Sequence, residues 1–166
     1  MQRSSSKYLP CLLTRLTDEN PFASKDSTYG TEFSAEQLRS DILANLSMLL
    51  NSHTSPEESR HLEKHYPQAA VSVFHYGIDS YAGRTSSYKQ PRVIAEAVRR
   101  AIVRYEPRVQ PESVQVLADP LRDGDDHTAL HLHIACRLAV APLSDDLYFR
   151  LRVDVETGET SLKPLA

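Results

Sequence analysis

The stretch ALHLHIACRLAV, residues 129–140, decides the fold because its apolar and polar side chains alternate. Successive side chains of a β-strand point to opposite faces, so this period of two predicts a strand with one buried face. The stretches SVQVLAD (113–119) and DLYFRLRVDVETGE (146–159) alternate in the same way. We therefore predict three antiparallel strands, whose buried face carries Leu130, Leu132, Ile134, Cys136, Leu138, Leu147, Phe149, Leu151, Val153 and Val155.

The segments between these stretches are rich in turn-forming residues. PLRDGDDH (120–127) and APLSDD (141–146) combine proline or glycine with aspartate, which is typical of loops between antiparallel strands. ETGE (156–159) predicts a further turn, after which TSLK (160–163) forms a short fourth strand. The C-terminal part of the chain is therefore predicted as an antiparallel meander of three to four strands.

Before this meander the apolar period lengthens to 3.6 residues, which indicates helices. Ser34 and Gln37 have the spacing of a capping box, and they predict the start of a helix that ends within residues 51–56. Its apolar stripe consists of Leu38, Ile42, Leu46, Leu49 and Leu50.

Prolines predict the start of two further helices. Pro67 begins a short helix with Gly77 as its C-terminal cap, and Pro91 begins a longer helix that ends at Tyr105. The longer helix has one apolar stripe, made of Ile94, Ala97, Val98, Ala101, Ile102 and Tyr105. We therefore predict an α+β fold, in which N-terminal helices pack on one face of the C-terminal antiparallel meander.

Length and composition fit one soluble domain with an additional arm. The chain has 166 residues, 40% of them hydrophobic, and residues 1–33 are polar without a sustained period. We predict an extended arm over 1–33, whose apolar motif YLPCLLTRL (8–16) docks on a neighbour or on its own domain, and a single domain over 34–166. Cys11 and Cys136 have no partner motif, and no apolar run of about 18 residues occurs, so a reduced, cytoplasmic protein is expected.

The net charge of −3 hides an uneven distribution. Residues 84–108 contain seven Lys or Arg and two Glu, a net charge of +5, whereas residues 109–166 contain five basic and ten acidic side chains, a net charge of −5. Docking of opposite patches into a larger assembly fits this pattern at least as well as nucleic-acid binding does. A nucleic-acid site would use Arg92, Arg99, Arg100 and Arg104.

Histidines near the start of the second strand raise the question of a metal site. His131 and His133 project to the same side of that strand, and His127 lies nearby with Asp125 and Asp126. Alternation already explains His131 and His133 as part of the polar face, and nothing fixes a third and a fourth ligand. We therefore expect no metal and no cofactor.

The third helix ends in RYEPRV, residues 104–109. Pro107 cannot continue the helix and pushes Glu106 towards extended geometry, so Glu106 and Arg108 are expected to project together. They are either a helix stop whose two charges pair with each other or a rigid plug for a partner. As the acid of a peptidoglycan hydrolase Glu106 is poorly placed, because Arg108 favours its charged form and no second carboxylate is clearly positioned. We expect no enzyme activity.

Four stretches in a fixed order carry a resemblance to a known family. They are LLTRLTDENP (12–21), ILANLSMLLNS (42–52), YPQAAVSVFHYGIDSYAG (66–83) and AIVRYEPRV (101–109). With them, the chain resembles the lysozyme-like family of phage tail baseplate wedge proteins, which includes the TssE subunits of type VI secretion systems. The polar segment SHTSPEESRHLEKH (52–65) is longer than this resemblance implies.

The resemblance implies a structural role and a set of partners. Proteins of this kind pack with the wedge proteins TssF and TssG, near TssK, at the cytoplasmic face of the inner membrane, with no direct membrane insertion and no nucleic acid. The sheath proteins TssB and TssC are expected to add strands to an edge of the sheet by β-augmentation. The resemblance also implies a partner-binding site, made of Arg104, Tyr105, Glu106, Pro107 and Arg108.

Overall fold

The computed structural model of the chain describes residues 8–17, 22, 33–80, 91–120, 128–140 and 145–165. These residues belong to two compact units, residues 1–45 and residues 46–166. Within these ranges, no helix is long and apolar enough to cross a membrane.

The first unit contains helix α1 (Leu12–Leu16) and the beginning of helix α2 (Ala35–Leu50), which continues into the second unit. The capping box predicted at the start of α2 is confirmed. The Ser34 N–H donates to Oε1 of Gln37 at 2.9 Å, and the Gln37 N–H donates to Oγ of Ser34 at 3.2 Å. The helix ends at Leu50, directly before the segment 51–56 in which its end was predicted.

Helix α1 uses its polar side for contacts within the first unit. The Thr14 hydroxyl donates to Oδ1 of Asp41 in α2 at 2.6 Å, and the Cys11 sulfur accepts the Thr14 N–H at 3.4 Å as an N-terminal cap. The four leucines of the motif 8–16 are exposed instead, namely Leu9, Leu12, Leu13 and Leu16.

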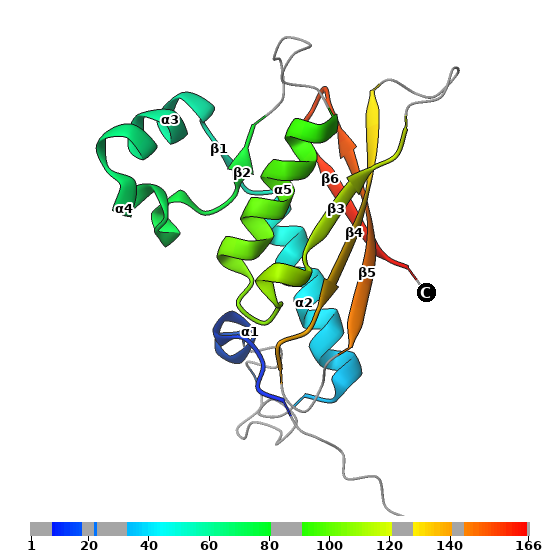
Figure 1. Cartoon of the computed structure of the whole chain (residues 1–166). Coiled ribbons are helices and arrows are strands. Elements are labelled where there is room, and N and C mark those ends of the chain that lie inside the picture. Colours follow the sequence, from blue (N-terminus) through cyan, green and yellow to red (C-terminus); the bar gives the residue numbers. More distant parts are fainter. Residues whose placement is uncertain are drawn as a thin grey trace, which may run out of the picture. The chain divides into compact units, whose positions relative to one another are not determined.

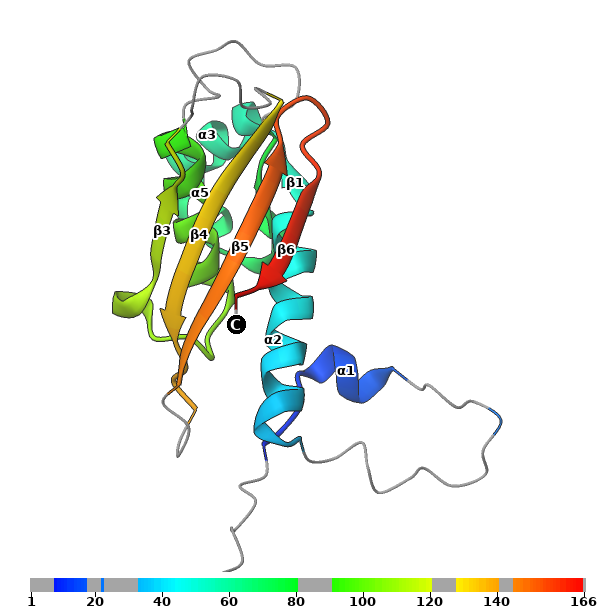
Figure 2. The same ribbon diagram turned by 90° about the vertical axis from the view of Figure 1, so that its right-hand side faces the viewer.

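The second unit contains a four-stranded antiparallel sheet in the order β3-β4-β5-β6. Its strands are β3 (Gln115–Ala118), β4 (Ala129–Arg137), β5 (Asp146–Asp154) and β6 (Thr160–Pro164). Figure 2 shows consecutive strands side by side, which is the predicted meander with its fourth strand. All ten apolar side chains that the alternation assigned to one face are buried.

Helix α5 (Pro91–Tyr105) packs on one face of this sheet, as Figure 1 shows, and it has the predicted bounds. It buries Ile94, Ala95, Ala97, Val98, Ala101 and Ile102. The last turn of α2 adds Leu46, Leu49 and Leu50 to the buried residues of this unit. The predicted α+β fold is therefore confirmed.

Residues 53–79, which we call the lobe, form a substructure of which the sequence predicted only a helix starting at Pro67. The lobe starts with strand β1 (His53–Thr54) and ends with strand β2 (Ile78–Asp79), and these two strands pair in parallel. Between them lie α3 (Pro56–His65), α4 (Pro67–Ala70) and the 3-10 helix η2 (Val73–His75). The predicted start of a short helix at Pro67 is confirmed, but its predicted end at Gly77 is wrong, because α4 ends at Ala70 and a separate 3-10 helix follows.

Gly77 closes the lobe through a close approach of two backbones. Its φ of 129° is one that side chains other than glycine rarely adopt, and a Cβ atom there would lie 2.3 Å from the carbonyl oxygen of Ser52. The same oxygen accepts the Ile78 N–H at 2.9 Å, which starts the pairing of β1 with β2. The glycine therefore serves the strand pair and not the end of an α-helix.

Candidate functional site

Helix α5 ends in a tight turn over residues 106–109. The Glu106 N–H still donates to the carbonyl of Ile102 at 2.9 Å, but Pro107 has no N–H and cannot continue the helix. The Val109 N–H then donates back to the carbonyl of Glu106 at 3.2 Å, so the turn has proline at its second position. The predicted extended segment is wrong here, because this turn hydrogen bond forms instead.

Within the turn, Glu106 and Arg108 pair with each other. Arg108 donates Nε to Oε1 of Glu106 and Nη2 to Oε2, both at 2.7 Å, and its backbone N–H donates to Oε1 at 3.2 Å. The side chain of Glu106 is 4% exposed and that of Arg108 is 18% exposed. A bidentate pair of this kind is strong and directional. The self-paired helix stop that the sequence left open is therefore present, and Pro107 is exposed at its tip.

The turn is fixed to the end of strand β4. The Ala139 N–H donates to the carbonyl of Arg108 at 2.7 Å, and the Gln110 N–H donates to the carbonyl of Arg137 at 2.8 Å. These two hydrogen bonds connect positions that are about thirty residues apart in the chain. The turn is thus held by the sheet as well as by its own ion pair.

The buried charge of Glu106 affects two neighbouring acidic groups. Burial, together with the charges of Glu106 and Asp146, raises the pKa of the Cys136 thiol to about 11. Burial also raises the pKa of Tyr76, with further contributions from Glu106 and Tyr105. Both groups therefore stay protonated at neutral pH.

Arg104 and Tyr105, the other two expected site residues, contact the lobe. Arg104 donates Nη1 to the carbonyl of Ala70 at 3.0 Å, and the Tyr105 hydroxyl donates to the carbonyl of His75. The structure thus brings four of the five expected residues into contacts that hold the chain's own fold. The sequence carried no sign of this, because the lobe had no predicted position.

Glu106 was also the candidate acid of a hydrolase. Arg108 donates hydrogen bonds to both carboxylate oxygens of Glu106, and the Glu106 side chain is almost completely buried. A general acid must reach the oxygen of the bond that breaks. The contacts of Glu106 are those of a structural brace and add no support to the hydrolase hypothesis.

The histidines of β4 lie on the polar face of the sheet, as alternation predicts. His131 is exposed, and Nε2 of His133 lies 2.9 Å from Oδ1 of Asp119. Asp125, Asp126 and His127, the other residues considered for a metal, lie outside the described residues.

Comparison with known proteins identifies the class of this chain as a subunit of phage-tail-like baseplates. The family model described as baseplate wedge protein gp25 matches residues 36–143, which is more than half of the chain. The chain belongs to the baseplate wedge protein gp25 family, so the resemblance seen in the sequence is confirmed. Neither the curated proteins nor the solved structures gave a match. Membership in this family of structural proteins implies interaction with other baseplate proteins.

Proposed function

We infer that this protein is the TssE subunit of a type VI secretion baseplate, a contractile phage-tail-like machine. It docks on TssF and TssG, near TssK, at the cytoplasmic face of the inner membrane, and helps TssB and TssC to start the sheath. The family match supports this proposal, as do the four ordered stretches of sequence. The observation that carries it is the rigid, proline-tipped turn within the matched range.

The turn is suited to docking because it is already ordered. Glu106 and Arg108 hold each other, and backbone bonds fix the turn to β4, so little conformational entropy is left to lose when a partner binds. Pro107 is the exposed residue between the two charges. The docking contact is therefore made by Pro107 and the outer surface of the pair, and the pair itself supports that contact.

Pro107→Glu tests this contact without breaking the pair. The turn tolerates other residues at this position, so we expect a loss of about 1 kcal/mol of stability or less. Co-purification with TssF and TssG should be lost. Pro120→Glu, which makes the same change at another exposed proline, is the control and should retain both partners. If Pro107→Glu is folded by circular dichroism and still binds both partners, docking through the turn is refuted.

The sheet has two edge strands, β3 and β6, at which sheath strands could be added. Strand β6 offers few backbone N–H and carbonyl groups for such pairing. The side chain of Asn51 already binds Thr160, accepting its N–H at 2.9 Å and donating to its carbonyl at 3.2 Å. Pro164 has no N–H to offer. By alternation, Leu162 is the residue of β6 that still directs an N–H away from β5.

Edge β3 is the better acceptor for an added strand. The Asp119 N–H donates to the carbonyl of His131 at 2.9 Å, which fixes the alternation along β3. Val116 and Ala118 therefore direct their N–H and carbonyl groups away from β4. Two donors and two acceptors in a row can pair with an incoming strand. We assign the contact with the sheath to β3.

Proline substitutions in β3 and in β6 test which of the two edge strands contacts the sheath. Ala118→Pro removes one outward N–H from β3, and Leu162→Pro removes one from β6, while neither removes a bond within the sheet. Growth of TssB and TssC sheaths on purified baseplates, counted by electron microscopy, should fall with Ala118→Pro and remain normal with Leu162→Pro. The reverse result would move the contact to β6, and normal growth with both would refute strand addition.

A further inference from the structure

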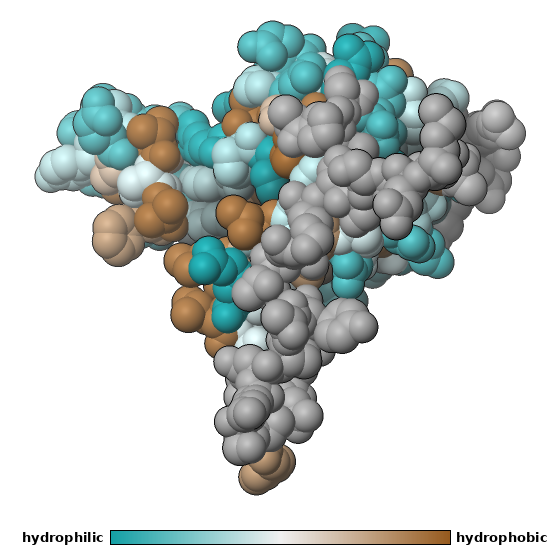
Figure 3. Space-filling view, turned by 90° about the horizontal axis from the view of Figure 1, so that it is seen from below, coloured by the Kyte–Doolittle hydropathy of each residue, from teal (hydrophilic) through white to brown (hydrophobic). Residues whose placement is uncertain are grey.

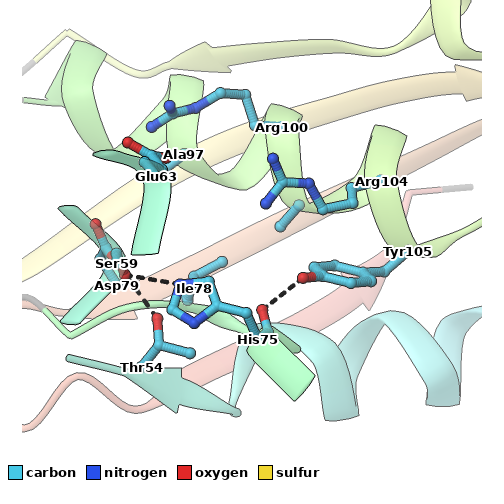
Figure 4. Close-up of a pocket in the computed structure, with 12 residues that line it drawn as sticks. Thr54, Ser59, Glu63, His75, Ile78, Asp79, Ala97, Arg100, Arg104 and Tyr105 are labelled. Atoms are coloured by element: carbon cyan, nitrogen blue, oxygen red, sulfur yellow. Dashed lines mark hydrogen bonds between the residues drawn. The ribbon is translucent and has the colours of Figure 1, made fainter. Parts of the chain in front are cut away.

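The lobe and helix α5 line a half-open cavity of about 60 Å³, shown in Figure 4. Ala97 and Ala101 of α5 line it with small side chains, which leave room between the helix and the lobe. Arg100 and Arg104, one helical turn apart, also line it. This volume is sufficient for one carboxylate group with a water molecule.

The polar groups on the lobe side of the cavity largely satisfy one another. The Ser59 hydroxyl donates to Oδ1 of Asp79 at 2.6 Å, and Thr54 donates to the same oxygen at 3.3 Å. Ser59 is 6% exposed, and its oxygen lies 2.8 Å from Nε2 of His75. A hydroxyl has one proton, and the carboxylate of Asp79 and the Ser55 carbonyl, 3.0 Å away, both compete for it, so Ser59 is placed as an acceptor towards His75. These residues are therefore a structural network and not the nucleophile and base of a hydrolase.

The two arginines differ in the hydrogen bonds that their guanidinium groups make within the chain. Arg104 is tied to the carbonyl of Ala70, whereas Arg100 is exposed and makes no hydrogen bond within the described part of the chain. Glu96, on the same helix, forms a bidentate pair with Arg99, and the charge of Arg100 is a smaller cause of its lowered pKa. Figure 4 shows both guanidinium groups, of Arg100 and Arg104, extending from α5 on the side of the lobe. The cavity thus offers two cations to a ligand.

Next to the cavity in sequence, the lobe exposes apolar side chains. Phe74, which precedes His75, is 96% exposed, and Val71 and Val73 are exposed too. Their backbone is held in place, because the Ser72 side chain caps η2 by accepting the Phe74 N–H at 3.3 Å. Figure 3 shows apolar side chains over the lobe at the left of the view. An apolar group so exposed on a fixed backbone is typical of an interaction surface.

We propose that this surface binds an acidic amphipathic segment of a partner protein. One carboxylate of the segment lies between Arg100 and Arg104, and an apolar side chain next to it packs on Val73 and Phe74. Glu63 and Asp79 also line the cavity, so a polyanion such as nucleic acid would meet negative charge there, whereas a single carboxylate fits between the arginines. The proposal rests on the proposed function only in taking the partner to be a baseplate protein.

The test uses a defined peptide and the full, isotope-labelled chain. The probes are N-acetyl-Leu-Glu-Leu-amide and its glutamine analogue, and NMR follows the amide shifts of residues 75–79 and 100–105. The glutamate peptide should cause saturable shifts there and should bind about tenfold more tightly than the glutamine peptide. Equal effects of the two peptides, or no shifts with either, would overturn the proposal.

Two variants and a matched control locate the binding. Arg100→Glu should abolish the difference between the peptides, and Phe74→Ser should weaken both of them. Arg92→Glu changes the charge of an exposed residue on the same helix outside the cavity, and binding should be unaffected. If Arg92→Glu weakens binding as much as Arg100→Glu, the site is wrong. If a short DNA duplex shifts these residues and the peptides do not, a nucleic-acid site replaces it.

The result for peptide binding can be distinguished from the result for binding to TssF and TssG. If the glutamate peptide binds but the protein does not co-purify with TssF and TssG, the cavity is a carboxylate site and the baseplate partners are wrong. If the partners co-purify and the peptide does not bind, the inference about the cavity fails alone.

Discussion

Replacing Arg108 with alanine should destabilise the second unit by about 3–5 kcal/mol, because a buried carboxylate is left without its partner. The magnitude follows from the contacts. Glu106 is 4% exposed, and the Arg108 side chain supplies two of its hydrogen bonds at 2.7 Å. Since a domain is stable by about 5–15 kcal/mol in total, this loss is a large part of the whole.

The contribution of the pair itself is measured by a double-mutant cycle. Glu106→Gln removes the charge and keeps an acceptor, so it should cost less than Arg108→Ala, and the double variant should recover part of the loss. Urea unfolding followed by circular dichroism provides the free energies. The coupling energy should be about 2 kcal/mol and should change little with salt, because solvent ions do not screen a buried pair.

Arg137 and Asp146 provide the control, since they pair at 2.7 Å on the exposed face of the sheet. Breaking this pair should change stability little, and any effect should disappear at high salt. If Arg108→Ala is no more destabilising than Arg137→Ala, then the turn is not a brace. Burial of the pair would then not stabilise the fold, and both charges of the turn would have to be assigned to a partner.

Three further predictions follow from single contacts. Gly77→Ala should lower thermal stability by about 3 kcal/mol or more, because the new Cβ meets the carbonyl oxygen of Ser52 and φ is unfavourable; a melting temperature within a degree of the parent would contradict it. The Cys136 thiol has its pKa raised to about 11 from 9.0, so the unfolded state loses this proton first. Stability should therefore fall by about 2 kcal/mol as pH rises from 9 to 11, and unfolding of Cys136→Ala over this range should show a smaller slope. Tyr105→Phe removes the bond to the carbonyl of His75 and should cost about 1 kcal/mol; amide exchange should speed up in the lobe and not in the sheet.

Strong periodicity made most of this fold predictable. The alternation in β4 and β5 defined their buried faces, because a strand with one face on the core cannot shift by one residue without exposing its apolar side chains. Helix α5 was predicted with its bounds, because Pro91 starts it, Pro107 stops it and a continuous apolar stripe lies between them. These signals are local, so they are visible in the chain alone.

Most of the lobe was not predicted, because its sequence has no strong apolar periodicity and its contacts join distant positions. Helix α3, with the sequence PEESRHLEKH, has few apolar residues, and the contacts of Ser59 with His75 and Asp79 join positions far apart in the chain. Its acidic first turn and basic last turn suit the helix dipole, and this was the signal that could have found it.

The site was predictable only in part. The sequence placed Glu106 beside Arg108, but their burial depends on Arg137 and Ala139 at the end of β4, about thirty residues later. A sequence pattern that spans a few residues cannot reveal contacts between positions so far apart in the chain.

The parallel pairing of β1 with β2 has a practical consequence. The chain enters the lobe at His53 and returns to its register partner Ile78 in the last strand of the lobe, so these two residues lie about 4.8 Å apart. The unusually long polar segment 52–65 is contained in this closed loop, where extra length does not stretch the strands of the sheet. The α3 part of the lobe is therefore the place to insert a fluorescent tag or an affinity peptide when the assembly is to be followed in cells.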